Sequence, residues 1–455
     1  MLVFVEKILR VQPNVKKLYL LLRAADGTSA SLRFQNEVIG KDLFRVAKEK
    51  WGVNLNSIIA KKIGIVPGDV RYEDLGIKDS YLREEMINEL DIVLNFAATT
   101  NFDERYDIAF GTNTIGANNV LCFAKNCIKL KGHMFSAYVC GDSSGLISEN
   151  PYFLGQTLNG VSKLDIEEEK KLIDEKINEL QAEGAPETII KRSMKDMGIE
   201  RAKTFGWPNT YVFTKAMGEM LVGHLKENVP VVIIRPTMVT ATCKEPFPGW
   251  IEGARTVDAL TLAYGKGKLT FFVVDLSAVV DVIPGDMVVN AIIVAMVAHA
   301  NQPCIDIIYH VGSSVRNPMR YSNFKDFLAR YFTTKPWIGK KGKPVKVVKF
   351  NLCFIRFNTS HTQVLKLANT IFCQRFQGAY SNLNRRIKLV VRIVELYQPY
   401  LFFHGIFDNS NLDKLRIAAE KNCVEMDIFF IDPKFIHWDD YFLNTHFPGV
   451  VEYVF

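Results

Sequence analysis

The sequence predicts an α/β protein built on a mainly parallel sheet with helices on both faces. Short apolar runs, bounded by charged or turn residues, recur up to about residue 311 and are typical of strands buried in a parallel sheet. Helical stretches and short connections separate these runs, which favours a doubly wound arrangement. The chain has 455 residues, 48% of them hydrophobic, and is long enough for one large or two ordinary domains.

Charge and cysteine usage narrow the class of protein. The net charge of +7 suits anionic ligands or a membrane surface, and no dense Lys/Arg run with interleaved aromatic residues indicates a nucleic-acid partner. The eight cysteines are scattered without metal-binding spacing, so we expect a reducing compartment and no metal site. We see no leader peptide and no uncharged apolar run of 18 residues, so we expect no membrane-spanning helix.

The N-terminal region begins with a helix over 3–10, followed by a strand over 17–23. A dinucleotide-binding fold opens with a strand and a glycine-rich turn before its first helix, so this strand and loop are missing from the sequence.

Arg23 ends the strand over 17–23, at a position where a cation suits the 2′-phosphate of NADP, or it is a solvated strand-end residue. In the strand segment 63–70, Asp69 follows the apolar run and Gly68, and accepts hydrogen bonds from adenine or caps the next turn.

Two later strands carry candidate site residues at their carboxyl ends, where ligands bind in open α/β sheets. The strand over 91–100 ends in small residues that admit a cofactor close to the backbone; these are Ala97, Ala98 and Thr99. After a helix that opens near 113–121, the strand over 134–140 places Ser136 near its end. The sequence therefore predicts a ligand site at this edge of the sheet.

Residues 148–206 interrupt the alternation with two helical segments, the first over 165–183. We interpret them as a helical insertion that is either a lid over the site or a surface hairpin. The alternation resumes with a strand over 230–236, whose last residue, Pro236, is another expected cofactor-binding position. A helix over 287–300 and a strand over 305–311 complete the sheet region.

The composition of the sequence changes near residue 322. We therefore expect a first domain over 1–321 and a smaller, mainly helical domain over 322–455. The basic segment 335–349 is a solvated loop or a contact for anionic groups. The apolar stretch 389–407 is a core helix, a membrane-surface helix or part of an acyl-chain tunnel.

The residues that suggest chemistry are Tyr211, Lys215 and Ser136. Tyr211 and Lys215 are one helical turn apart, so both side chains leave the same face of a helix. A nearby ammonium makes a phenol a better proton donor, and a serine hydroxyl and a phenol together can bind one carbonyl oxygen. This combination suits hydride transfer from a nicotinamide cofactor. Ser136 as an acyl-transfer nucleophile is the weaker alternative, because no GxSxG motif surrounds it.

The arrangement Ser136…Tyr211-x-x-x-Lys215 resembles the extended short-chain dehydrogenase/reductases, which have a Rossmann-like fold. Longer strings are similar to the plant-type alcohol-forming fatty acyl-CoA reductases, and the tail resembles the C-terminal domain of that family. These strings are residues 95–107, 136–141, 207–215 and 281–290, and in the tail 438–441 and 446–450.

The resemblance implies that residues 1–321 bind NADPH and that long-chain acyl-CoA is reduced to a primary alcohol through an aldehyde. Tyr211 and Ser136 would stabilise the oxyanion, and Lys215 would bind the nicotinamide ribose. The alcohols of this family feed waxes and suberin. The resemblance also implies peripheral association with the cytosolic face of the endoplasmic reticulum membrane, or a cytoplasmic location, with the basic segment near the CoA phosphates or the membrane.

Two departures from the family pattern leave alternatives open. The family's glycine-rich pyrophosphate loop is absent, and Phe135 stands where the family often has a serine. The alternatives are a truncated, inactive member that binds lipid or a partner, and an extended reductase that acts on sugar nucleotides.

Overall fold

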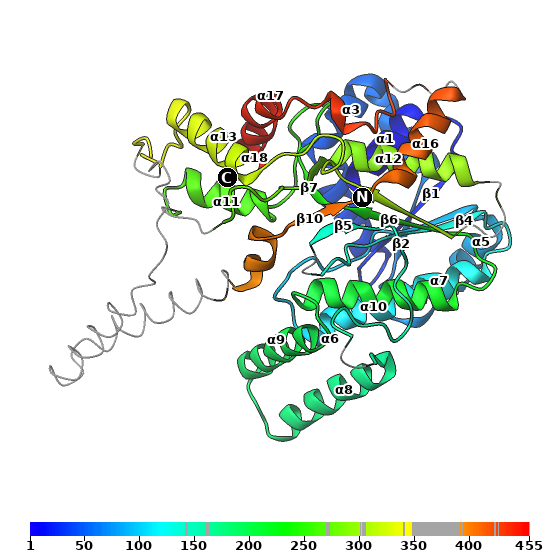
Figure 1. Cartoon of the computed structure of the whole chain (residues 1–455). Helices are drawn as coiled ribbons and strands as arrows, with labels where there is room; N and C mark the ends of the chain where they lie inside the picture. Colours follow the sequence, from blue (N-terminus) through cyan, green and yellow to red (C-terminus); the bar gives the residue numbers. More distant parts are fainter. Residues whose placement is uncertain are drawn as a thin grey trace, which may run out of the picture. The chain divides into compact units, whose positions relative to one another are not determined.

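A computed structural model gives the architecture of the chain (Figure 1). It describes residues 1–141, 144–160, 163–269, 274–300, 302, 306–339, 342–347, 392, 395–422, 425 and 427–454. In chain order, the helices and strands are α1 (Leu2–Val11), β1 (Leu18–Leu22), α2 (Gly27–Phe34), η1 (Gln35–Ile39), η2 (Asp42–Phe44), α3 (Arg45–Trp51), η3 (Gly52–Asn54), α4 (Leu55–Lys62), β2 (Ile63–Pro67), η4 (Glu73–Gly76), α5 (Ser80–Glu89), β3 (Ile92–Asn95), α6 (Tyr106–Ala109), η5 (Phe110–Ile115), α7 (Gly116–Asn126), β4 (Gly132–Ser136), β5 (Gly145–Ile147), α8 (Ile166–Ala182), α9 (Glu187–Thr204), α10 (Thr210–Leu225), β6 (Val231–Pro236), β7 (Met238–Thr240), α11 (Val257–Gly265), β8 (Val282–Pro284), α12 (Gly285–His299), β9 (Asp306–Val311), α13 (Tyr321–Thr334), β10 (Gly405–Phe407), α16 (Ser410–Lys421), η6 (Pro433–Phe435), α17 (Trp438–Asp440), η7 (Tyr441–His446) and α18 (Phe447–Tyr453).

The central sheet is parallel and has the strand order β3-β4-β6-β9. Helices follow its strands along the chain, which confirms the expected α/β class. The strand expected over 134–140 ends earlier, at Ser136, which pairs with Ile234 of β6. Ser136 therefore stands at the carboxyl end of a central strand.

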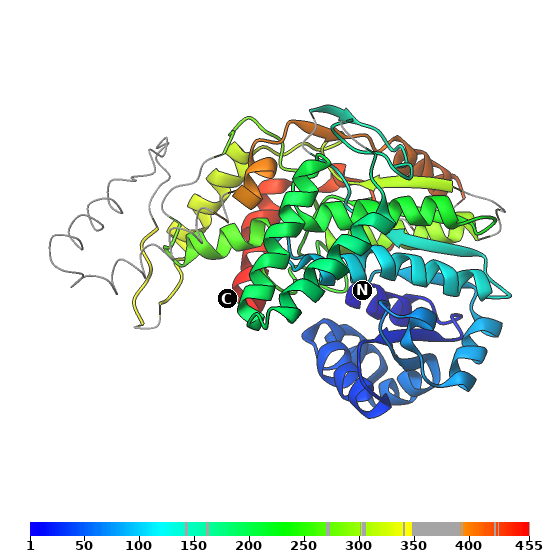
Figure 2. The same ribbon diagram turned by 90° about the horizontal axis from the view of Figure 1, so that it is seen from below.

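The strands β1 and β2 form a separate two-stranded parallel sheet, shown with its helices in Figure 2. In a dinucleotide-binding sheet the first strand lies between the second and the fourth. Here β1 and β3 are the two strands that would flank it, and each is paired on one side only among the described residues. Most side chains of both strands are half-buried rather than buried, as expected for strands at an edge.

Helices cover both faces of the central sheet (Figure 1). The helices α7 and α10 lie on one face, and α12 and α16 lie on the other. The face of α10 packs into a core built from β4, β6 and the helical insertion; its largest aromatic members are Tyr106, Phe135, Trp207 and Phe213. This packing holds α10 directly against the strand that ends in Ser136.

The expected insertion is present as the helical pair α8 and α9. The Asp165 carboxylate caps α8 by accepting from the backbone amides of Glu167 and Glu168. Gly184 has a φ of 66° at the break between the helices, a conformation that favours glycine. The sequence analysis missed α5, although Asp79 caps it in the same way, by accepting from the Leu82 amide.

The chain forms two compact units. The first contains residues 1–262, 280–319 and 405–455, and the second contains residues 263–279 and 320–404. The expected boundary after residue 321 falls beside the start of the second unit's longer segment. Part of the apolar stretch 389–407 and part of the basic segment 335–349 lie outside the described residues. Residues 405–407, expected within a helical stretch, instead form β10, which pairs in parallel with β5 in the first unit.

Candidate functional site

Tyr211 and Lys215 lie in the first turns of α10, as the sequence predicts. The helix starts here because Asn209 is in an extended conformation and its side chain accepts from the Val212 amide at 3.1 Å. The preceding Trp207 is buried, and its indole nitrogen donates to the Val139 carbonyl at 3.2 Å. Because Val139 follows β4, this bond ties the start of α10 to the strand that carries Ser136.

Lys215 is buried, with 1% of its surface exposed. Its ammonium lies 4.2 Å from the centre of the Phe135 ring, the residue before Ser136. Burial lowers the pKa of Lys215 to about 7, and the charge of Glu219, one turn further along α10, acts in the opposite direction. Lys215 therefore contacts the residue that precedes Ser136 on β4, and Tyr211 lies one turn before Lys215 on the same helix.

Tyr211 is half-buried, and its ring stacks on Phe102 with centroids 5.9 Å apart. Its apolar surroundings raise the pKa of the phenol to about 12, and the charge of Arg255 opposes this shift. The sequence analysis expected the nearby ammonium of Lys215 to make the phenol a better proton donor. In the structure desolvation outweighs the charge of Arg255, so Tyr211 is protonated at neutral pH.

The loop after β3 is tied to the Tyr211 helix by Asn113, a buried residue of η5. Its side-chain oxygen accepts from the Thr99 amide at 3.0 Å, and its nitrogen donates to the Thr99 carbonyl at 3.2 Å. The same nitrogen donates to Thr214 of α10 at 3.0 Å. Ala97 is half-buried and Ala98 is exposed in this loop. Asn113 thus links the predicted cofactor-binding loop to Thr214, the residue before Lys215.

Arg23 and Asp69 stand at the carboxyl ends of β1 and β2, in the other sheet of the first unit. Arg23 is exposed, and its charge acts on Asp69. The Asp69 carboxylate accepts from the Arg71 guanidinium at 2.8 to 3.2 Å and from the Arg71 amide at 3.0 Å. Burial raises the pKa of Asp69, but these bonds outweigh burial and hold it below its ordinary value. Asp69 is therefore an ionised partner of Arg71 in this structure.

Pro236 ends β6, beside Val311 of β9, where the sequence analysis expects a cofactor contact. The sequence analysis missed the neighbouring Arg235, which forms a buried ion pair with Glu219. A charged residue inside the apolar run of a buried strand requires a buried partner, and that was the available signal. The pair partly neutralises the carboxylate that faces Lys215.

These residues fit the nicotinamide end of a dinucleotide cofactor. Among the described residues, no acceptor binds the Lys215 ammonium, so a ribose hydroxyl would find a free donor there. The small side chains of Ala97 and Ala98 leave the backbone after β3 accessible. Within the described ranges, no group of three or more metal-binding side chains is present, and no helix is long and apolar enough to cross a bilayer.

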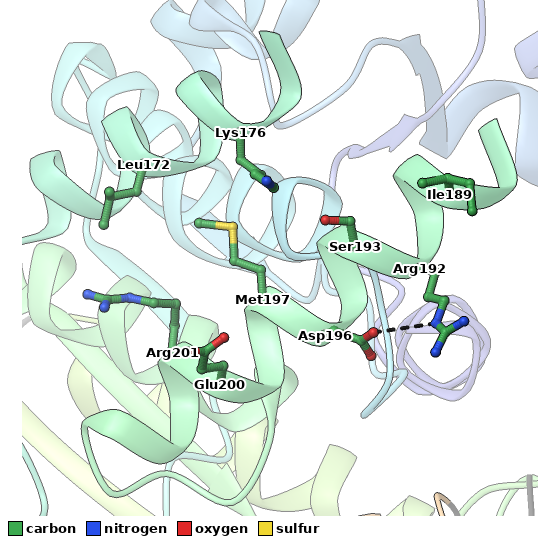
Figure 3. Close-up of a pocket in the computed structure, with 9 residues that line it drawn as sticks. All are labelled: Leu172, Lys176, Ile189, Arg192, Ser193, Asp196, Met197, Glu200 and Arg201. Atoms are coloured by element: carbon green, nitrogen blue, oxygen red, sulfur yellow. Dashed lines mark ion pairs between the residues drawn. The ribbon is translucent and has the colours of Figure 1, made fainter. Parts of the chain in front are cut away.

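A surface pocket of about 560 Å³ lies between α8 and α9 (Figure 3). Its lining combines apolar residues such as Leu172 and Met197 with charged residues such as Lys176. Arg192 and Asp196, also in the lining, form an ion pair 3.7 Å apart. The pocket includes none of the predicted site residues, so the role of the insertion as a lid stays a prediction.

Comparisons with known proteins identify the family. The family described as male sterility protein matches through its NAD-binding domain over residues 2–292, and through its Sterile domain over residues 357–455. The alcohol-forming fatty acyl-CoA reductase of Simmondsia chinensis is 56% identical over 99% of this chain and 94% of its own length. Fatty acyl-CoA reductase 1 of Arabidopsis thaliana is 51% identical with the same coverage of both chains.

Solved structures support the fold. The reductase domain of a nonribosomal peptide synthetase from Mycobacterium tuberculosis has a TM-score of 0.56 and 17% identity, over 99% of this chain and 87% of that domain. The terminal R domain of the myxalamid biosynthetic pathway has a TM-score of 0.51 and 16% identity, over 95% of this chain and 85% of that domain. At these identities the likeness concerns the fold alone. By its family matches and its full-length relatives, the chain belongs to the male sterility protein family, with the plant fatty acyl-CoA reductases.

Proposed function

We propose that this protein reduces long-chain acyl-CoA to a primary alcohol, by way of the aldehyde, with NADPH. The observation that supports the proposal is the contact of Lys215, one turn after Tyr211 on α10, with the residue before Ser136 on β4, in a chain 56% identical to an alcohol-forming fatty acyl-CoA reductase.

The proposed chemistry follows from the protonation states at the site. A nicotinamide cofactor supplies hydride to a carbonyl carbon. Ser136 and Tyr211 donate hydrogen bonds to the thioester oxygen, and they stabilise the oxyanion that forms before CoA leaves. Tyr211, whose pKa is about 12, holds its proton until an oxyanion develops, and it donates that proton when the aldehyde is reduced. Lys215 binds a ribose hydroxyl and adds positive charge beside the phenol.

The preference for NADPH rests on Arg23. This exposed guanidinium stands at the end of β1, where a cation suits a 2′-phosphate. The Asp69 carboxylate is bound by the Arg71 guanidinium. Its proposed role is therefore to shape the adenine side of the site by fixing the turn after β2.

We also propose a peripheral location on the cytosolic face of the endoplasmic reticulum membrane, or in the cytoplasm, and a product that enters waxes or suberin. The amphiphilic substrate supports a membrane location, because long-chain acyl-CoA partitions into bilayers. Fractionation of a tagged full-length chain, followed by a carbonate wash, tests this part of the proposal.

The test of the activity uses the purified full chain with palmitoyl-CoA and NADPH. We expect fatty alcohol as the product, and a fall in kcat/KM of about 10²- to 10⁴-fold in Tyr211→Phe, because a positioned proton donor is lost. Tyr81→Phe is the matched control, since Tyr81 is 86% exposed and lies on α5. The proposal fails if the wild-type protein forms neither aldehyde nor alcohol, or if Tyr211→Phe keeps full activity.

A further inference from the structure

The feature with no assigned role is the ring of Phe135. It is fully buried on β4, between strands β3 and β6, where it pairs with Asn95 and Ile233. The Lys215 ammonium lies 4.2 Å from the centre of this ring. At that distance the negative face of an aromatic ring attracts a cation, and the attraction is strongest where water is excluded. Both side chains meet this condition, with 0% and 1% of their surface exposed.

The ammonium has few other partners. Within the described residues no hydrogen-bond acceptor is assigned to it, and the charge that acts on it is that of Glu219 on its own helix. Glu219 is bound by Arg235 of β6, so its negative charge is shared. The other titratable group on this face of α10 is Tyr211, which is neutral at physiological pH. The Phe135 ring is therefore the contact that stabilises the charged form of Lys215 relative to the neutral form.

We propose that Phe135 is a positioning residue for the reaction: its ring holds the Lys215 ammonium in place and keeps it protonated, one helical turn from Tyr211. A serine at this position has a hydroxyl but no ring face. The inference rests on the proposed function, because it assumes that the charged form of Lys215 serves cofactor binding and proton donation.

The geometry explains how a fully buried lysine stays charged at working pH. Burial lowers the pKa of Lys215 to about 7, so at pH 7 half of the molecules have a neutral Lys215. A π face below the ammonium stabilises the charged form only, so the ring raises this pKa. When the ring face is weakened, the charge is lost at lower pH.

The experiment compares Phe135 with leucine and with ring-fluorinated phenylalanine at position 135. Fluorination keeps the shape of the ring and weakens the negative charge on its face. The fluorinated protein should therefore fold even if Phe135→Leu does not, and it still tests the inference. We expect the pKa of Lys215 to fall by about one pH unit, the size of a desolvated cation–π contact. The readout is NMR of ¹³C-labelled lysine in the full chain, with the signal assigned by Lys215→Arg.

The same fluorination at Phe213 is the packing control. Phe213 is buried in the same core two residues before Lys215, and its ring neighbours are aromatic rings rather than a cation. In the activity assay, the alkaline limb of kcat/KM should move down by about one pH unit for the position-135 variants and stay in place for the control. An unchanged Lys215 pKa in fluorinated protein overturns the inference. A shifted pKa in a protein that does not reduce acyl-CoA supports the effect of the Phe135 ring on the Lys215 ammonium, but it overturns the role of Phe135 in the reaction together with the proposed function.

Discussion

At the scale of single residues, the site depends on side chains that bridge different elements. Asn113 joins the loop after β3 to α10, and Thr114 also binds α10 by donating to the Thr214 carbonyl at 2.8 Å. Both residues are buried, but only Asn113 touches Thr99. Replacing Asn113 therefore affects the loop after β3 as well as α10, whereas replacing Thr114 affects only the contact with α10.

We predict that Asn113→Ala raises the KM for NADPH, because the Thr99 backbone loses both of its hydrogen bonds to the Asn113 side chain. The free energy of unfolding should fall by about 2 kcal/mol, since buried partners stay unpaired. Thr114→Val is the matched control: it should destabilise the protein by about 1 kcal/mol and leave the KM for NADPH unchanged. Steady-state kinetics and urea denaturation measure both quantities. Equal changes in KM for the two variants would contradict the role of Asn113.

The sequence analysis predicted Ser136, Tyr211 and Lys215 as site residues, but it did not predict Asn113, Arg235 or Glu219. The first group forms a local pattern: one residue at a strand end, and two residues one turn apart on a helix. The second group acts through contacts between residues that are 14 to 101 positions apart in the sequence. Such contacts follow from how strands and helices pack, so a single sequence does not reveal them.

At the scale of elements, α10 is held in place at its start. Asn209 caps its first turn, and Tyr211 lies in that turn. A frayed first turn would move the phenol while leaving the rest of the helix anchored in the core.

We predict that Asn209→Ala lowers kcat and reduces the free energy of unfolding by about 1 kcal/mol, the usual cost of a lost N-cap. Asp165→Ala removes the corresponding cap from α8 in the insertion, where no predicted catalytic residue lies. Its stability loss should be similar, with kcat unchanged. Measured kcat and denaturation midpoints decide the matter, and a similar loss of kcat in both variants would show that general destabilisation explains the effect.

The alternation of strands and helices was predicted well at this scale, because hydrophobic periodicity is local. The short strands β5 and β10 were missed. Each has three residues, and they pair across more than half of the chain. Their backbone hydrogen bonds exist only because the tertiary fold brings Ile406 beside Leu146, and these side chains stay 36% and 67% exposed, respectively.

At the scale of the whole molecule, buried histidines link stability to pH. His133 is fully buried in β4, and burial lowers the pKa of its imidazole to about 4. The unfolded chain binds this proton near pH 6.5, so protonation favours unfolding. The stability contributed by neutral His133 is complete above pH 6.5 and is lost as the pH falls toward 4.

We predict that His133→Leu reduces the acid sensitivity of the fold. The wild-type protein should lose about 2 kcal/mol of unfolding free energy through His133 between pH 7.5 and pH 5, and the variant should not lose this part. Urea denaturation at the two pH values measures the difference. His437→Gln, at an exposed position, should behave like the wild-type protein. An equal pH dependence for wild type and His133→Leu would contradict the assignment.

The sequence by itself determined the α/β class, the strand that carries Ser136 and the helix that carries Tyr211 and Lys215 one turn apart, because periods of two and 3.6 residues are properties of the local chain. Only the tertiary structure decided the ionisation of the site. The pKa of Lys215 near 7 and that of Tyr211 near 12 arise from desolvation, and the Phe135 ring under Lys215 arises from the packing of β4 against α10. Desolvation and ring contacts depend on which elements meet in space, and that information is not local in the sequence.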